Sequence, residues 1–191
     1  MGGRLKRLAP FFMRSLNSYK GIHKGETCAV LGGAVTLPAD LRAIPQVDVL
    51  IGVNQHSLIL PLDYVCFLDR QMWDYVEGFR DILKVTPLNK WASRNDVIHA
   101  GEAPVIGFSG ALAVWVAGIM GFEKIYVCGM DQYENRDGRE YWWEGPQTKR
   151  AVNHTSARDS LKRWQDFINS LECKGRIEFV SGRLKEQIKC K

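Results

Sequence analysis

Long apolar runs and paired cysteines are both missing from this sequence. No stretch approaches the length of a membrane span, about 20 apolar residues, and the basic start lacks an uninterrupted apolar segment with a small-residue cleavage site. The sequence has 5 cysteines, an odd number, and contains no CxxC motif. Both features argue against a disulfide framework and against a structural zinc site. We therefore expect a cytoplasmic protein with reduced thiols.

Common nucleotide-binding and metal motifs are missing as well. The sequence contains neither GxxxxGK[ST] nor GxGxxG, which mark P-loop and dinucleotide-binding proteins. It also has no close DxD pair, so its spacing does not support metal-dependent nucleotide-sugar chemistry of the usual kind. We expect no metal site and no cofactor.

The composition is that of an ordinary globular protein with an excess of positive charge. With 191 residues, of which 46% are hydrophobic, the chain has enough length for one well-buried core. The net charge of +5 favours anionic partners such as nucleotides, phosphosugars, nucleic acid or acidic lipid. Residues 1–24 combine basic and apolar side chains in the manner of an amphipathic helix, which could contact a membrane surface or a partner, or pack on the domain.

Short apolar runs that end in Gly, Asn, Asp or Ser predict a parallel sheet. The expected strands cover residues 27–31, 47–53, 64–68, 124–128 and 177–180. Helical patterns lie between several of them, at residues 38–44, 109–120 and 157–171. Runs that are apolar on both faces suit strands covered by helices on both sides. We therefore expect residues 25–191 to form one doubly wound, mostly parallel, Rossmann-like α/β domain.

Two stretches interrupt this pattern, at residues 71–104 and 132–153. The second is rich in polar and aromatic residues and shows neither a helical nor a strand period. Because it is long for a connection, we interpret it as a lid or binding loop. Its aromatic-basic part, residues 136–150, suits either stacking on a nucleic-acid strand or folding of its tryptophans onto the core.

Two glycine-containing turns are candidates for binding phosphate. Gly32 and Gly33 follow the first expected strand, where backbone N–H groups can approach a phosphate, although an ordinary tight turn would use the same residues. Ser109 and Gly110 open the helix at 109–120, where the serine either caps the helix or helps to bind an anion. Ser109 is not flanked as a GxSxG nucleophile would be, because Ala111 stands at the last position.

Polar side chains at strand and helix ends are further candidates. Asp69 and Asp131 each follow an apolar strand, where a carboxylate either reaches a ligand or caps a turn. Of the histidines, only His154 combines a polar loop with a position directly before an expected helix. It suits a general base or an exposed capping residue.

The order of these motifs resembles that of the small bacterial lipo-oligosaccharide sialyltransferases. The segments that carry the resemblance are AVLGGAVTL, Gly52-Val53-Asn54-Gln55, the stretch from Phe108-Ser109-Gly110 to Gly129-Met130-Asp131-Gln132-Tyr133, and His154 with Asp159 five residues later. The wider group also includes archaeal-type 6-hydroxymethylpterin pyrophosphokinase-like domains and phage proteins.

The resemblance implies a GT-A-variant form of the fold and a role for several residues. His154 would deprotonate an acceptor hydroxyl, and Tyr133 and Tyr141 would assist the departing nucleotide phosphate. The implied nucleotide contacts come from Gly32, Asn54, Ser109 and Gly110. This chain departs from the family pattern at Gly33, where an asparagine is expected, and at Asp69.

Three hypotheses follow. The first is metal-independent transfer of a sugar from a nucleotide-activated donor, such as a CMP-linked one, to a glycan, a lipid-linked sugar or a nucleic acid. The second is pyrophosphoryl transfer from ATP to a small heterocycle, with Mg²⁺ held by Asp69 and Asp131. The third is a nucleotide- or nucleic-acid-binding module without catalysis. Peripheral membrane contact through residues 1–24 and formation of a homo-oligomer are open under each hypothesis.

Overall fold

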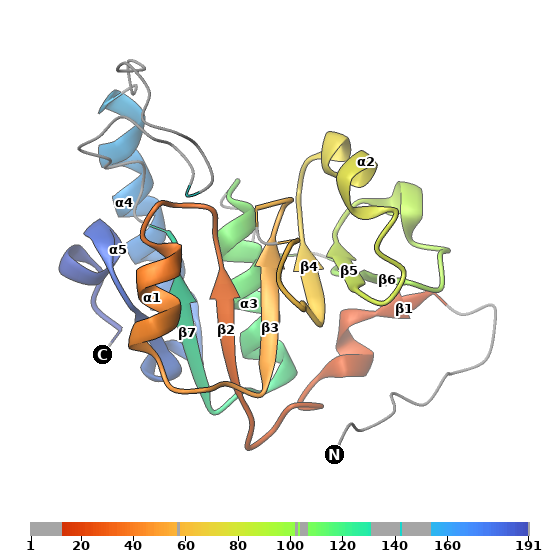
Figure 1. Cartoon of the computed structure of the whole chain (residues 1–191), viewed down its shortest axis with the longest axis horizontal. Coiled ribbons are helices and arrows are strands. Elements are labelled where there is room, and N and C mark those ends of the chain that lie inside the picture. Colours follow the sequence, from red (N-terminus) through yellow and green to blue (C-terminus); the bar gives the residue numbers. More distant parts are fainter. Residues whose placement is uncertain are drawn as a thin grey trace.

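The chain forms one open parallel sheet. The computed structural model describes residues 13–56, 58–101, 103, 107–130, 142 and 154–190, with the backbone alone for 154–159. Within these residues lie 8 strands in the order β1-β6-β5-β4-β3-β2-β7-β8, and all neighbours are parallel (Figure 1). The strands are β1 (Arg14–Ser15), β2 (Thr27–Leu31), β3 (Val49–Val53), β4 (Tyr64–Cys66), β5 (Leu83–Thr86), β6 (Val97–His99), β7 (Lys124–Cys128) and β8 (Ile177–Phe179).

The central strands are buried on both faces, which explains their continuous apolar sequences. In β2, Cys28 and Val30 belong to one core cluster, whereas Ala29 and Leu31 belong to the other. All four side chains are fully buried. Because successive side chains of a strand point to opposite faces, a strand that is covered on both sides needs apolar residues throughout.

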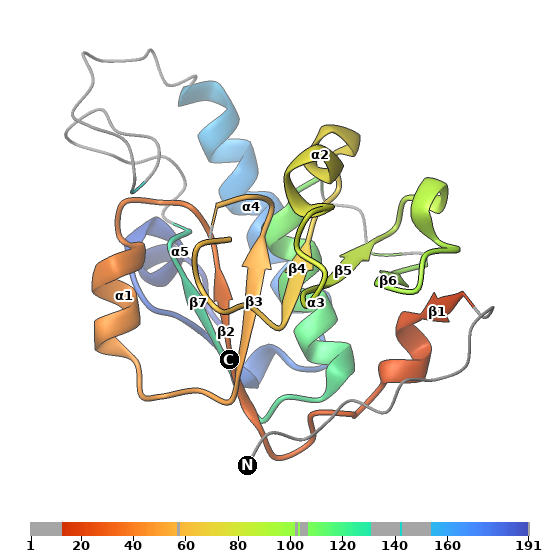
Figure 2. The same cartoon turned by 45° about the vertical axis from the view of Figure 1, so that its right-hand side comes forward.

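Helices cover both faces of the sheet. α1 (Leu37–Ala43) and α2 (Trp73–Val76) pack on the face that carries Ala29 and Leu31. α3 (Ser109–Met120), α4 (His154–Ser170) and α5 (Gly182–Gln187) pack on the other face. Figures 1 and 2 show α1 and α3 on opposite sides of the sheet. The doubly wound α/β fold that the sequence predicts is therefore confirmed.

Most of the expected elements are present with small shifts at their ends. β2, β7 and α3 have the expected bounds, and the other expected strands are shorter by one or two residues. Gly121 ends α3 with φ of 91°, and its N–H donates to the carbonyls of Ala117 and Gly118. Glycine adopts this left-handed conformation without the strain that a Cβ would cause. Four 3-10 turns complete the described part: η1 (Leu16–Tyr19), η2 (Arg70–Met72), η3 (Asn89–Trp91) and η4 (Lys174–Arg176).

Two regions differ from the expectation. The interruption at residues 71–104 contains β5 and β6, which the sequence pattern did not indicate. Residues 14–19, part of the expected amphipathic helix, form β1 and η1 instead, and Leu16 and Tyr19 are buried against the α3 face. Among the described helices, none has both the length and the apolar character that crossing a membrane requires. The expected lid at 132–153 lies outside the described residues except for Trp142.

Candidate functional site

The strand order reverses between β2 and β7. From β2 the chain proceeds outward through β3 to β6, and α3 then returns it to β7 on the other side of β2. In open α/β sheets, ligands bind at such a reversal, outside the carboxyl ends of the strands. The candidate site therefore lies at the upper edge of the sheet in Figure 1, where β2, β3 and β7 end.

The turn after β2 is tied to the turn after β7. Gly32 donates its N–H to the Cys128 carbonyl over 2.9 Å, and Ala34 donates to the Gly129 carbonyl over 2.9 Å. A Cβ built at Gly32 would lie 2.3 Å from the Gly129 carbonyl oxygen. Glycine is therefore required at position 32 by the neighbouring strand end, independently of the ligand contact that the sequence predicts.

A buried carboxylate connects these turns to α1. Asp40 is only 3% exposed, and its Oδ2 accepts hydrogen bonds from the Gly129 N–H and the Ser181 hydroxyl, each over 2.8 Å. The carboxylate thus ties α1 to the ends of β7 and β8. No sequence pattern indicated Asp40, because its partners are 89 and 141 residues away along the chain.

Two amide side chains with buried, unpaired oxygens follow β3. Asn54 has φ of 53°, a left-handed conformation that asparagine tolerates better than most residues. Asn54 Oδ1 and Gln55 Oε1 are shielded from solvent and accept no hydrogen bond from the described residues, and the same holds for Thr36 Oγ1 after β2. Because buried polar atoms normally have partners, donors for these oxygens have to come from outside the described residues.

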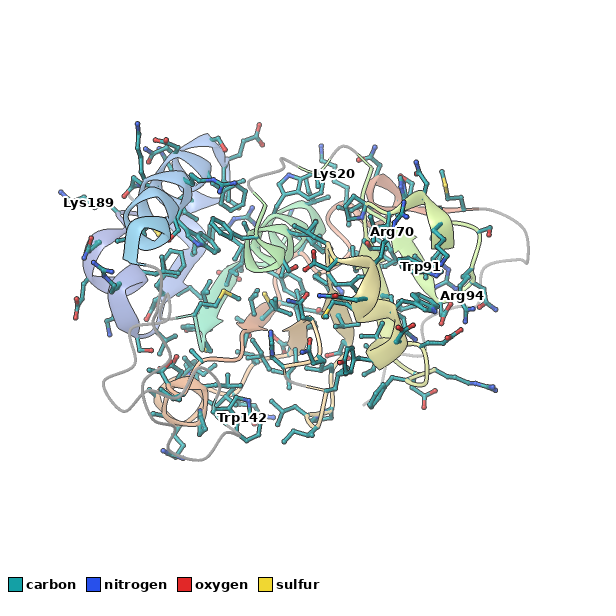
Figure 3. The ribbon with its side chains drawn as sticks, turned by 90° about the horizontal axis from the view of Figure 1, so that it is seen from above. Lys20, Arg70, Trp91, Arg94, Trp142 and Lys189 are labelled. Carbon is teal, nitrogen blue, oxygen red and sulfur yellow. The ribbon has the colours of Figure 1, made fainter. Side chains whose placement is uncertain are left out.

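Trp142 lies over the ends of β2 and β3. Its backbone N–H donates to the Gly33 carbonyl over 3.0 Å, and its indole Nε1–H donates to the His56 carbonyl over 3.1 Å. The ring packs against the core on the α1 side, and in the view from above Trp142 lies close to α1 (Figure 3). Burial lowers the pKa of His56 to about 4, so its imidazole is neutral at neutral pH. His56 was not among the residues that the sequence indicated, although it directly follows Asn54 and Gln55.

The start of α3 differs from the capping arrangement considered for Ser109. Phe108 occupies the N-cap position, and no side chain caps the helix. Ser109 is the first helical residue, and its hydroxyl accepts a hydrogen bond from the Leu68 N–H over 3.2 Å, which links α3 to the end of β4. The first hydrogen bonds of the helix are donated by Ala111 and Leu112 to the Phe108 carbonyl. Among the described residues the N–H groups of Ser109 and Gly110 therefore have no acceptor, as is usual at an uncapped helix start.

Of the remaining residues that the sequence indicates, Asp69 is described, whereas the side chains of the others are not. Asp69 follows β4, is exposed, and stands before η2 without capping it through its side chain. His154 is the first residue of α4, but its side chain lies outside the described part, as do Asp131, Tyr133 and Tyr141. Among the described residues, no group of three or more His, Cys, Asp or Glu side chains is arranged to hold a metal ion.

At the ends of the central strands, the described residues offer two chemically different sets of groups. Hydrogen-bond acceptors from Asn54 and Gln55 lie at the end of β3. Hydrogen-bond donors from Ser109 and Gly110 lie at the start of α3, which packs on β2, β3 and β4. Such a site can hold a ligand that offers N–H or O–H groups at one end and negative charge at the other.

Solved structures of bacterial sialyltransferases share this fold. No protein-family model matches the sequence, and a search of the curated proteins finds no match. The sialyltransferase CstII from Campylobacter jejuni, solved in complex with a substrate analogue, cytidine-5'-monophosphate, superposes with a TM-score of 0.59 at 14% identity, covering 86% of this chain and 84% of that one. The monofunctional alpha-2,3-sialyltransferase Cst-I from the same organism gives a TM-score of 0.54 at 14% identity, covering 85% and 79%. The chain therefore shares its α/β fold with these two proteins.

Proposed function

We propose that this protein transfers a sugar from a nucleotide-activated donor to an acceptor hydroxyl, and that a CMP-linked sugar is the donor to test first. The observation that carries the proposal is that the amide oxygens of Asn54 and Gln55 are buried and have no hydrogen-bond partner among the described residues. They lie at the strand reversal of a fold shared with a sialyltransferase that was solved with cytidine-5'-monophosphate.

The end of β3 suits the nucleoside part of the donor. Asn54 Oδ1 and Gln55 Oε1 can only accept hydrogen bonds, and a nucleoside offers ribose hydroxyls and the amino group of its base. Leaving either oxygen unpaired in the folded protein costs about 1–3 kcal/mol. A nucleoside that donates to these atoms removes this cost on binding, which favours its affinity.

The start of α3 suits the phosphate. The positive end of the helix dipole and the N–H groups of Ser109 and Gly110 favour an anion at this position. The same donors stabilise the charge that develops on the phosphate when the sugar leaves, so the proposed transfer needs no metal ion.

The chemical step is assigned to residues from the sequence motifs. His154 takes the proton of the acceptor hydroxyl while the hydroxyl oxygen bonds to the anomeric carbon of the donor. The bond between that carbon and the phosphate oxygen breaks, and the nucleotide leaves with the electron pair. Tyr133 and Tyr141 donate hydrogen bonds to the leaving phosphate, and Gly32, Gly33, Asp69 and Asp131 border the nucleotide.

Calorimetric titration with CMP, with and without Mg²⁺, tests the binding part of the proposal. We expect metal-independent binding to the wild type and about tenfold weaker binding to Asn54→Gly, which keeps the left-handed backbone but removes the side-chain oxygen. Asn95→Gly, at an exposed turn before β6, is the matched control and should bind as the wild type does. Equal CMP binding by Asn54→Gly would refute the assignment of the nucleoside end.

Replacement of His154 tests the catalytic part. His154→Ala should abolish turnover of the donor and leave CMP binding nearly unchanged, because the residue acts on the acceptor. Turnover at the wild-type rate in this variant would exclude His154 as the base.

A further inference from the structure

Trp164 carries a buried polar group that its surroundings do not satisfy. The residue lies on α4 and is 1% exposed. Its indole Nε1–H has no acceptor among the described residues. An indole N–H can only donate, and a buried tryptophan usually finds a partner for it. An unpaired donor in the core therefore calls for an explanation.

The indole lies directly against the start of α3. Its Cζ2 atom, on the same edge of the ring as Nε1, is 3.6 Å from a Cβ built at Gly110. Its ring is parallel to that of Phe108, with 6.2 Å between the centroids and 3° between the planes. The unpaired donor is thus beside the same helical turn whose Ser109 and Gly110 N–H groups also have no acceptor among the described residues.

The side chain of Met130 fills the space beside Gly110. The Cβ built at Gly110 would lie 2.8 Å from Met130 Sδ, so a ligand atom can occupy this position only when the Met130 side chain moves. Met130 is partly exposed and follows β7 at the strand reversal. Its unbranched side chain has three rotatable bonds and can move aside at little cost.

From this geometry we infer that Trp164 is a ligand-binding residue, whose indole N–H donates to a phosphate oxygen of the nucleotide held at the start of α3. The inference rests on the nucleotide site proposed above and adds a residue from α4 to it. Three donors then converge on one anion: the N–H groups of Ser109 and Gly110 and the indole of Trp164. A hydrogen bond to a charged oxygen is stronger than one between neutral groups, which gives the buried indole a measurable effect on affinity.

The test compares CMP with cytidine, which has the same nucleoside and no phosphate. Trp164→Phe removes the N–H and keeps an aromatic ring. We expect about tenfold weaker binding of CMP and unchanged binding of cytidine. Trp115→Phe is the matched control, because Trp115 packs on the same core cluster from the middle of α3. It should leave both affinities as in the wild type.

The outcomes separate this inference from the proposed function. Absence of CMP binding by the wild type would overturn both. Wild-type CMP affinity in Trp164→Phe would overturn the inference alone, and equal losses for CMP and cytidine would overturn the assignment to the phosphate.

If Trp164→Phe does not fold, NMR spectra of the tryptophan indole N–H groups in the wild type test the inference instead. One of the 6 tryptophan signals should shift with CMP and not with cytidine, and this signal should persist in Trp142→Phe. If no signal behaves in this way, the inference is wrong.

Discussion

The two halves of the sheet differ in the hydrogen bonding of their buried polar groups. The reversal half, made of β2, β3, β7, α1 and the start of α3, leaves polar atoms of Thr36, Asn54 and Gln55 unpaired within the described chain. The outer half, made of β4, β5, β6 and α2, pairs its buried charge: Lys84 is fully buried and donates to Asp96 over 3.1 Å and to the Phe79 carbonyl. These polar groups of the outer half stabilise the fold, whereas the three unpaired atoms of the reversal half are available to a ligand.

Aromatic stacking and ion pairs strengthen the outer half further. Trp73 and Trp91 stack with 4.6 Å between their centroids, and the Arg94 guanidinium lies 4.7 Å above Trp73. Arg94 also donates to Asp96 and to Glu77, each over 3.2 Å. The side chains of this cluster are partners for one another, so the cluster stabilises the fold without a ligand. We therefore expect substitutions in the outer half to alter stability alone, and substitutions in the reversal half to alter ligand binding.

The largest effect is expected from Lys84→Ala. Burial alone would raise the pKa of Asp96, but hydrogen bonds from Arg94 and Lys84 hold it below its ordinary value. Removing Lys84 takes away one of these partners and leaves a cavity, so we expect the free energy of unfolding in urea to fall by about 3 kcal/mol. Lys84→Met, which fills most of the space, should lose less. CMP affinity should be unchanged, and a large change would show that the two halves are not independent.

Asp40→Ala should change both properties, because Asp40 lies in the reversal half. The variant leaves the Gly129 N–H and the Ser181 hydroxyl without their shared acceptor, which should lower stability by about 2 kcal/mol. The end of β7 then loses its hydrogen bond to α1, so CMP binding should weaken as well. Asp40→Asn keeps an oxygen acceptor and should recover most of both losses. Normal CMP affinity in Asp40→Ala would limit this carboxylate to a role in stability.

Protonation of His56 should make stability depend on pH. The folded protein lowers the pKa of His56 from 6.5 to about 4 through burial. Between these values the unfolded chain binds more protons, so stability is present above pH 6.5 and is lost as the pH falls toward 4. After allowance for solvent screening of the partly exposed ring, we expect a loss of about 1–2 kcal/mol. In His56→Gln, urea unfolding should show a flatter profile over this range, and an unchanged profile would assign the dependence to other groups.

The sequence pattern predicts the inner strands better than the outer ones, for a physical reason. β2 and β7 are buried on both faces, so their apolar runs are visible in the sequence. β5 contains Lys84, whose charge interrupts the apolar pattern of the strand. The sequence does not show that this charge is paired, because its partner Asp96 comes 12 residues later. At the site, Asn54 and Ser109 were recognisable from local motifs. Asp40 and Trp164 were not, because their roles arise from contacts between distant segments.

The smallest effect on stability, and the sharpest test of the comparison, is expected from Gln55→Met. The substitution removes the buried unpaired Oε1 and keeps a side chain of similar length and shape. Because an unsatisfied polar atom is replaced by an apolar one, the free energy of unfolding should rise by about 1 kcal/mol without ligand. CMP affinity should fall at the same time, since the nucleoside loses an acceptor. Urea unfolding and calorimetric titration of the same preparation measure the two changes, and a fall in stability with unchanged affinity would mean that Gln55 serves the fold and not the ligand.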